Sequence, residues 1–319
     1  MIWGSLLDDA GLEAIIPPDL SGQRVDAAAA ALFPDFSRSR LTAWIRDGRM
    51  TVDGEVLKPK LKVFQGQRLA LQPGEQAETR WIAQDIPVPV LYADDDIIIV
   101  DKGIGQVVHP GAGNPDGTLV NGLLHQFPDL ETIPRCGIVH RIDKDTSGLL
   151  AIARSERAHK SLTAQLQDRS MGREYWCVAL GEIRFSGQVD APIGRHPSQR
   201  TRMAVVGSGR EALTHYQIAN RFPAATELLV TLATGRTHQI RVHMAHIGHP
   251  LLGDPVYGGN RPLPSTAPPA LKAAQQRLNR QALHAQRLSL IHPADQELWS
   301  WESELPADLA ELQQVLQAL

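Results

Sequence analysis

A segment rich in proline, glycine, glutamate and glutamine, residues 74–89, divides the chain into two parts of different character. Such a composition favours an extended linker over packed secondary structure. The 319 residues are also too many for one small module. We therefore predict an N-terminal extension over residues 1–20, a small domain over residues 21–73, the linker, and a large domain over residues 90–319.

The composition excludes several classes of protein. The chain is 43% hydrophobic and 21% charged, which is typical of a globular protein, and no apolar run approaches the ~18 residues of a bilayer-spanning helix. The first basic residue is Arg24, so the basic start of a secretory signal is lacking. The two cysteines, Cys136 and Cys177, have no metal-binding spacing. We expect a cytoplasmic protein without a membrane partner, a disulfide scaffold or a cysteine-rich zinc site.

Positive charge is concentrated in the small domain. The whole chain carries a net charge of −3. Residues 21–72, however, hold nine basic and five acidic side chains, a local charge of +4. The net charge of the whole chain argues against a polyanionic partner. The local charge of this segment points the other way and reopens the question.

Two short helices followed by strands are predicted in this domain. The second helix begins after the N-cap residue Ser37 and places Leu41, Trp44 and Ile45 on one face. The Asp-Gly pair at 53–54 is a type I′ turn signal, which predicts a hairpin. We expect the apolar face of the helix to pack inward and its arginines to project.

Three arginines of this region, Arg38, Arg46 and Arg49, are candidate RNA contacts. For an isolated run of charge, a solvated helix face is the more common explanation. Residues 21–73 resemble the S4 RNA-binding fold in the order of their parts. An arginine-bearing helix comes first, a glycine ends it, and strands around an Asp-Gly turn follow. The resemblance implies a domain that grips structured RNA through guanidinium groups, which pair with phosphates and stack on bases.

Polar side chains gather in the large domain at residues 140–148. Residues 149–153 are predicted to form a buried strand, and Ser155 to cap the helix that follows. Catalytic groups often lie in polar loops held by such a rigid scaffold. Asp143 in this loop is a candidate catalytic carboxylate, and a turn-forming or ion-paired aspartate is an alternative of equal weight.

Histidines gather in a second segment, residues 234–259. Residues 237–243 alternate polar and apolar side chains, as a strand does. The segment holds four histidines: His238, His243, His246 and His249. They lack the HExxH motif and the accompanying carboxylate ligand of a zinc site, so we expect no metal.

Three motifs of the large domain together resemble the RluA-type family of pseudouridine synthases: HRIDKDTSG from residue 140, REYWCVALGE from residue 173 and TGRTHQIRVHMAHIGHPLLGDPVYGG from residue 234. The resemblance implies an α+β fold, with a mixed, largely antiparallel sheet and a central RNA-binding cleft, preceded by the small S4-like domain. It also implies isomerisation of uridine to pseudouridine in large-subunit (23S) ribosomal RNA. A tRNA-directed enzyme is the alternative.

The family's functional residues transfer to matching positions. Asp143 matches the catalytic aspartate, Tyr175 the tyrosine that stacks on the target base, and Arg236 the arginine that ion-pairs with the aspartate. Arg141 matches the arginine that fills the gap left by the flipped uridine, and Leu251 an apolar pocket residue. The resemblance implies no cofactor, because the reaction involves no net oxidation or hydrolysis.

Further RNA contacts are expected from residues 195–202. This segment holds Arg195, Arg200 and Arg202 without an acidic residue and is predicted to form a β-hairpin arm. The uridine must leave its stack before it reacts, at a cost of a few kcal/mol that basic contacts must offset. The predicted partner is a stem-loop of large-subunit rRNA, free or within a pre-ribosomal particle, bound by a monomer.

Two rival functions fit the sequence less well. An assembly factor that only binds RNA explains the basic domain but not the joint presence of Asp143, Tyr175 and Arg236. A metal-dependent phosphodiesterase would need a cluster of metal ligands. The sequence leaves open whether the aspartate attacks ribose C1′ or base C6, or starts elimination from the ribose.

Overall fold

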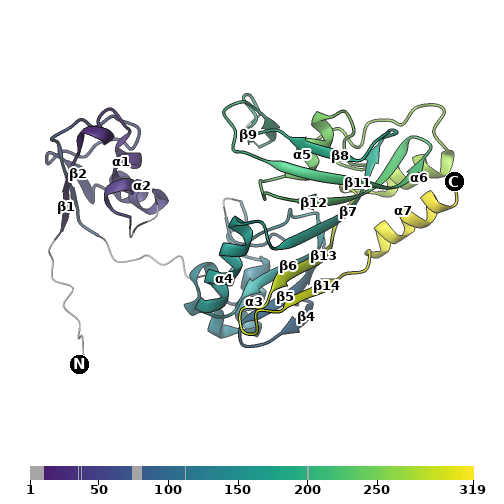
Figure 1. Ribbon diagram of the computed structural model, residues 1–319, viewed down its shortest axis with the longest axis horizontal. Coiled ribbons are helices and arrows are strands. Elements are labelled where there is room, and N and C mark those ends of the chain that lie inside the picture. The colour runs from purple at the N-terminus through teal and green to yellow at the C-terminus, as the bar shows by residue number, and fades with distance from the viewer. Residues whose placement is uncertain (1–10, 35, 37, 74–80, 112, 200) are drawn as a thin grey trace. The chain divides into compact units, whose positions relative to one another are not determined.

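The chain forms two compact units, one up to residue 80 and one from Trp81 to the C-terminus (Figure 1). The computed structural model describes residues 11–34, 36, 38–73, 81–111, 113–199 and 201–319. Each unit is described by itself. No helix within these residues is long and apolar enough to cross a membrane.

The small unit consists of a three-stranded sheet and two helices around a common core. Its elements are β1 (Leu12–Ile15), the 3-10 turn η1 (Pro18–Leu20), α1 (Val25–Leu32), α2 (Arg38–Arg46), β2 (Met50–Val52) and β3 (Arg68–Leu71). β3 lies between the other two strands and runs antiparallel to both. Leu41, Trp44 and Ile45 of α2 are buried in the core, as predicted.

The small unit begins before the predicted boundary at residue 21. β1 pairs with β3 along its whole length, with Leu12 opposite Leu71 and Ile15 opposite Arg68. Backbone hydrogen bonds of the sheet therefore extend into the segment that was predicted to be an extension, residues 1–20.

Of the predicted hairpin, the structure contains the turn but not the second strand. Asp53 and Gly54 both have a positive φ, 50° and 85°, as a type I′ turn requires. The strand after the turn is reduced to a single bridge between Val52 and Glu55, because β2 forms its ladder with β3 instead. Ser37, the predicted N-cap of α2, lies outside the described residues.

The large unit is built on one mixed sheet. Its first half holds β4 (Val90–Ala93), β5 (Ile97–Lys102), α3 (Leu119–Gln126), the 3-10 turns η2 (Pro128–Thr132) and η3 (Pro134–Gly137), β6 (Ser147–Ala153), α4 (Glu156–Gln167) and β7 (Gly172–Leu180). Its second half holds β8 (Gly187–Asp190), β9 (Ile193–Arg195), β10 (Met203–Val205), β11 (Leu213–Phe222), β12 (Ala225–Leu232), α5 (Gln239–His246), α6 (Pro269–Arg277), β13 (Leu283–Ile291), β14 (Leu298–Glu302) and α7 (Ala307–Gln317).

The described strands of the main sheet follow the order β4-β5-β6-β13-β7-β12-β11-β8, and β14 pairs with β13. β6 and β13 run parallel, and the other pairs run antiparallel. The predicted α+β class, with a mixed and largely antiparallel sheet, is confirmed. β13 comes late in the chain and inserts between β6 and β7, so it joins the two halves of the sheet.

Helices cover both faces of this sheet (Figure 1). On β5, Ile98 and Val100 pack in one core cluster with α3, whereas Ile97 and Ile99 pack in another with α4. This division follows from the alternation of side chains along a strand. Because both faces are covered, β5 and β6 appear in the sequence as continuous apolar runs. Ser155 caps α4 by accepting a hydrogen bond from the N–H of Ala158, as predicted.

The second part of the predicted linker belongs to the large unit. The N–H of Gln84 donates to the carbonyl oxygen of Asn121 at 2.9 Å, and the Asn121 amide donates to the carbonyl oxygen of Ile82 at 2.7 Å. Val88 is buried in the same core cluster as α3. The large unit therefore starts near Trp81 rather than at residue 90, and residues 74–80 lie outside the described residues.

A left-handed turn leads into the polar loop before β6. Three successive residues, Arg135, Cys136 and Gly137, have φ values of 55°, 48° and 77°. A Cβ atom at Gly137 would lie 1.9 Å from the carbonyl oxygen of Ala153. Only glycine therefore fits this position, where the turn touches the end of β6.

Replacing Gly137 with alanine should destabilise the large unit by at least about 2–3 kcal/mol, because left-handed strain and the clash with Ala153 add together. The measurement is the urea midpoint of unfolding. Gly207→Ala is the matched control, since its Cβ would meet nothing within 4 Å. Equal midpoints for the two variants would contradict the argument.

Candidate active site

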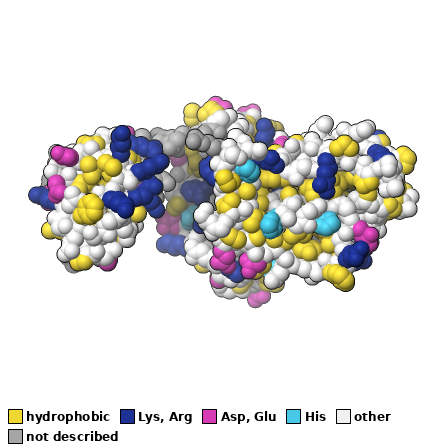
Figure 2. Space-filling view, turned by 90° about the horizontal axis from the view of Figure 1, so that it is seen from above, with side chains coloured by type: hydrophobic (Ala, Val, Ile, Leu, Met, Phe, Trp, Pro, Cys, Tyr) yellow, Lys and Arg dark blue, Asp and Glu magenta, His cyan; other side chains and the backbone are white. Residues whose placement is uncertain are grey.

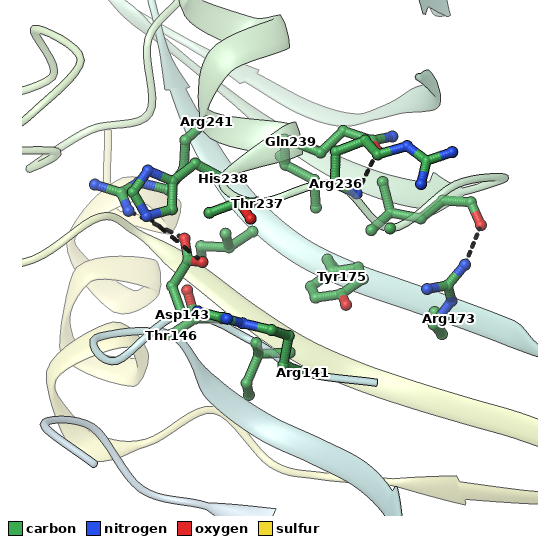
Figure 3. Close-up of a pocket in the computed structure, with 15 residues that line it drawn as sticks. Arg141, Asp143, Thr146, Arg173, Tyr175, Arg236, Thr237, His238, Gln239 and Arg241 are labelled. Atoms are coloured by element: carbon green, nitrogen blue, oxygen red, sulfur yellow. Dashed lines mark hydrogen bonds and ion pairs between the residues drawn. The ribbon is translucent and has the colours of Figure 1, made fainter. Parts of the chain in front are cut away.

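A pocket opens where the loop before β6 meets β7 and the start of α5. It encloses about 550 Å³ of space, part of it open to solvent. The loop contributes Arg141 and Asp143, β7 contributes Arg173 and Tyr175, and the turn before α5 contributes Arg236. Four sequence-predicted site residues, Arg141, Asp143, Tyr175 and Arg236, therefore line one pocket (Figure 3).

Asp143 is held by Arg241, the third residue of α5. Nη1 of Arg241 donates to Oδ2 of Asp143 at 3.0 Å. The same guanidinium donates to both carboxylate oxygens of Asp254, from Nε at 2.7 Å and from Nη2 at 3.0 Å. Burial opposes the charge of Arg241, but Asp254 and Asp143 outweigh it and raise the pKa of the guanidinium. Arg241 is thus a fixed cation between two carboxylates.

Asp254 has no solvent-exposed surface. Besides Arg241, its Oδ1 accepts hydrogen bonds from the backbone N–H groups of Val256 and Tyr257, at 2.8 and 3.0 Å. These contacts tie the chain that follows Asp254 to α5. Neither Arg241 nor Asp254 was predicted to be a site residue, although both stand in the motif that begins at residue 234.

The predicted ion pair between Arg236 and Asp143 is wrong. Nε of Arg236 instead donates to the carbonyl oxygen of Glu211 at 2.8 Å. Its backbone N–H donates to the side chain of Gln239, which closes the turn before α5. Arg236 lines the pocket without contacting the carboxylate (Figure 3).

A second prediction for this segment, that of its secondary structure, is also wrong. Residues 237–243 were predicted to be a strand, but the helix α5 begins at Gln239. All six residues from Gln239 to Met244 are buried, so no polar face reveals the helical period. The helix turns Arg241 toward Asp143, whereas the strand prediction grouped it with residues 237 and 239 on one face.

His238 lies at the edge of the same carboxylate. It precedes α5 in a left-handed conformation with φ 57°, and its Nε2 lies 3.9 Å from Oδ1 of Asp143. Its Nδ1 is 2.8 Å from the hydroxyl oxygen of Tyr257, which accepts a hydrogen bond from the N–H of Met203. Burial lowers the pKa of His238, and the charge of Asp143 offsets this only in part. A neutral imidazole therefore stands beside Asp143 at neutral pH.

Lys102 supports the polar loop from behind. Its side chain is fully buried, and its ammonium group donates to the carbonyl oxygens of Gly103 at 2.7 Å and Lys144 at 3.0 Å. Burial lowers the pKa of Lys102 to about 8, against the opposing effect of Asp145 and Asp143. No local signal singles out Lys102, because a lysine shortly after an apolar run resembles an ordinary strand end.

Tyr175 forms part of the pocket floor. Its side chain is 5% exposed, and burial raises the pKa of its phenol. A tyrosine with a neutral phenol, held on a rigid strand, offers a flat apolar ring with a polar hydroxyl at its tip. Arg141 stands at the opening, where its side chain is exposed and its Nη1 lies 3.5 Å from Nε2 of His109.

Leu251 does not line the pocket. It is fully buried in the main core cluster and forms a bridge with Ala179 of β7. The apolar part of the pocket wall comes instead from Ile142, Leu232 and Leu283, among others. Leu251 therefore supports the strand that carries Tyr175.

The predicted hairpin arm is present as β9 and β10, which pair antiparallel. Arg195 is exposed at the end of β9. Arg202 is held inside the protein, because its guanidinium donates to the carbonyl oxygen of Val256 and lies 5.2 Å from the centroid of the Tyr257 ring. Arg200 lies outside the described residues.

The three arginines predicted to contact RNA from the small unit differ in their surroundings. Nη2 of Arg38 pairs with Asp26 at 3.0 Å, whereas Arg46 and Arg49 are exposed. Lys and Arg side chains gather along one flank of this unit (Figure 2). Arg46 and Arg49 are therefore the better candidates for contact with an anionic partner.

The four histidines of the segment 234–259 do not converge. His243, for example, is buried between Thr214 and the carbonyl oxygen of Ala191, with both ring nitrogens at 2.9 Å from these oxygens. Within the described part of the chain, no group of three or more His, Cys, Asp and Glu side chains is arranged to hold a metal ion.

Comparison with known proteins identifies the family. Residues 96–246 match the family described as RNA pseudouridylate synthase. The chain is 52% identical to ribosomal large subunit pseudouridine synthase D of Pseudomonas aeruginosa, over 92% of both chains. It is 49% identical to the protein of that name in Escherichia coli K12, over 96% of this chain and 94% of the relative.

Solved structures agree in fold. The human RNA pseudouridylate synthase domain containing 4 protein has a TM-score of 0.56 at 23% identity, over 72% of this chain and 93% of its own. The human domain containing 1 protein has a TM-score of 0.53 at 24% identity, over 77% and 97%. From the matched segment, the similarity to the bacterial relatives and the shared fold, we conclude that the chain belongs to the RNA pseudouridylate synthase family.

Proposed function

We propose that this protein isomerises uridine to pseudouridine in the RNA of the large ribosomal subunit and that Asp143 carries out the chemistry. The observation that carries the proposal is the 52% identity with a large-subunit pseudouridine synthase D across 92% of both chains. The pocket around Asp143 supports it, because a carboxylate fixed by Arg241 stands beside the flat ring of Tyr175. No cofactor takes part in the proposed reaction.

The reaction needs few groups. The bond between ribose C1′ and base N1 breaks, the base turns, and a new bond forms between C1′ and C5. C5 loses a proton and N1 gains one, so the product is an isomer of the substrate. A carboxylate can serve as the nucleophile at C1′ or at C6, or as the base that starts elimination. Each route needs the carboxylate in a fixed orientation relative to the nucleotide. The hydrogen bond from Arg241 to Asp143 holds the carboxylate in place.

The other residues act around this centre. Tyr175 offers a stacking surface for the flipped base, and Arg141 at the opening can occupy the space that the base leaves in the RNA. Arg236 is assigned to the wall of the pocket rather than to the carboxylate. Arg195 at the end of β9 is assigned to the RNA backbone.

The small unit is proposed to be an S4-like RNA-binding domain. It holds an exposed pair of arginines at the end of α2, and a chain segment of residues 74–80 joins it to the synthase unit. Binding of a structured stem-loop by one unit raises the effective concentration of the target near the other. We assign choice of site to this unit and chemistry to the other.

Mapping of pseudouridines in ribosomal and transfer RNA tests the proposed function. Cells that lack the protein should lose modification at one or more positions of large-subunit rRNA and keep it in tRNA. Return of the modification on expression of the intact chain is the control. Loss confined to tRNA would support the tRNA-directed alternative and refute the proposal.

Asp143→Asn should abolish isomerisation and change RNA affinity by no more than a few-fold, because the amide keeps the shape but is neither a nucleophile nor a base. Tritium release from C5-labelled uridine measures the reaction, and filter binding measures the affinity. Asp145→Asn is the matched control in the same loop, since Asp145 does not line the pocket. Isomerisation at a sizeable fraction of the normal rate by the Asp143 variant would refute its assignment.

Arg241→Lys should reduce the single-turnover rate at saturating RNA by roughly 10- to 100-fold, because an ammonium cannot hold Asp143 and Asp254 with the fork of a guanidinium. Arg236→Lys should stay within a few-fold of the natural enzyme. Lysine is chosen because Arg241→Ala would leave Asp254 buried and unpaired, at a cost of about 3–5 kcal/mol. A larger loss for the Arg236 variant would restore the ion pair that the sequence predicted.

The double variant Arg46→Ala, Arg49→Ala should weaken the salt dependence of RNA binding. Each lost phosphate contact should reduce the slope of log K against log salt by ~0.7 on single-stranded RNA. Arg68→Ala is the matched control in the same unit, because Arg68 is already paired with Glu13. An unchanged slope would mean that Arg46 and Arg49 are only a solvated surface.

A further inference from the structure

Arg173 is a buried cation that the chemistry described above does not use. It lies near the start of β7, lines the pocket, and is 8% exposed. Its Nη2 donates to the carbonyl oxygen of Leu232 at 3.2 Å, and its Nε is buried without a hydrogen-bond partner. No carboxylate of the described residues forms an ion pair with it. The guanidinium therefore has donors to spare inside the active-site pocket.

The surrounding backbone makes room for this guanidinium. A Cβ atom at position 235 would lie 2.9 Å from Nη1 of Arg173, and Gly235 has none. Arg173 and Tyr175 are two residues apart on one strand, so they share a face and lie about 6.7 Å apart along it. In Figure 3, Tyr175 lies between Asp143 and Arg173. A ring that stacks on Tyr175 with its glycosidic bond near Asp143 would thus direct its far edge toward Arg173.

A buried cation without a counter-charge is costly, since a charge removed from water loses its hydration unless other groups compensate. The substrate is the natural source of compensation. Phosphates lie on the outside of a flipped nucleotide, where the exposed Arg141 stands. The depth of Arg173 favours the other polar groups of a uridine, the carbonyl oxygens of its base.

We propose that Arg173 is a specificity-determining residue, whose guanidinium donates to a carbonyl oxygen of the flipped uracil on the edge away from Asp143. This inference rests on the proposed isomerisation of uridine. Guanidinium groups only donate hydrogen bonds. On the edge away from the glycosidic bond, uracil has a carbonyl oxygen at C4, whereas cytosine has an amino group there, which is also a donor. Arg173 thereby favours uracil over cytosine.

The turn of the base during the reaction strengthens this assignment. C5 replaces N1 at the ribose when the ring rotates about the line through N3 and C6, and the rotation exchanges O2 and O4. A donor that faces one carbonyl before the rotation faces the other afterwards. Arg173 can therefore hold the detached base in both orientations, which is what an isomerase without a cofactor needs.

The guanidinium also lies where charge develops. When C1′–N1 breaks with its electron pair on N1, the negative charge spreads to O2 and O4. When a nucleophile adds at C6, the electron pair of the C5–C6 double bond moves toward O4. In both routes a cation at a carbonyl oxygen stabilises the anionic base more than the neutral one.

The test is a coupling experiment between Arg173 and the base. The natural enzyme and Arg173→Met react, at saturating RNA and single turnover, with an rRNA fragment whose target is uridine, 2-thiouridine or 4-thiouridine. Arg173→Met should slow uridine by about 10- to 100-fold, the size expected for one charged hydrogen bond. Sulfur is a weak hydrogen-bond acceptor. With at least one of the two thio targets, the natural enzyme should therefore react about tenfold more slowly than with uridine. For Arg173→Met, the same replacement should lower the rate by less than threefold.

Arg287→Met is the matched control. Arg287 lies on the adjacent strand β13, is exposed and pairs with Glu302, so its variant should keep the thio effect of the natural enzyme. In a second readout, competition binding, an RNA with cytidine at the target should bind the natural enzyme more weakly than the uridine RNA, and Arg173→Met should reduce that difference at least threefold.

Two results would overturn the proposal. One is a thio effect of equal size in the natural enzyme and in Arg173→Met. The other is that Arg173→Met no longer slows the reaction when a neutral methylphosphonate replaces the phosphate next to the target uridine. That result would mean that the guanidinium contacts the RNA backbone. If the natural enzyme failed to isomerise uridine in the mapped fragment, the proposed function would fail instead, independently of Arg173.

Discussion

The contact on which the active site depends is the double ion pair of Arg241 with Asp143 and Asp254. It joins three parts of the chain: the loop before β6, the helix α5 and the segment after Leu251. Asp254 cannot reach water, so it needs the guanidinium, and the guanidinium then has one nitrogen left for Asp143. The packing of the buried Asp254 and the orientation of Asp143 in the pocket thereby depend on a single side chain.

The sheet supplies the rigid frame for this contact. β6, β13 and β7 lie next to one another, so the loop that carries Asp143 and the strand that carries Tyr175 and Arg173 are separated by one strand. The left-handed turn at 135–137 and the ammonium of Lys102 hold the loop from its two sides. The pocket is therefore lined by short connecting segments together with the regular elements that hold them.

Much of this arrangement could be predicted from the sequence, and the exceptions have physical causes. Residues 149–153 form a short continuous apolar run, and Ser155 is a strong cap, so local signals sufficed for this strand and for the helix that follows. The strand assignment at 237–243 failed because a helix buried on all sides has no polar face. The ion-pair assignment to Arg236 came from the family resemblance and named the wrong arginine of the motif, since Arg241 makes the contact with Asp143. Lys102 and Arg173 gave no local signal, since only tertiary packing makes a lysine or an arginine buried.

The position of β13 in the sheet also has a consequence for biosynthesis. β13 comprises Leu283–Ile291, close to the end of a 319-residue chain, yet it lies between β6 and β7. A nascent chain that still lacks these residues cannot bring Asp143 and Tyr175 to their final spacing. Domains fold as units during synthesis, so this synthase unit completes its fold only after β13 has been made. The pocket that Asp143 and Tyr175 line therefore forms only when this late strand is present.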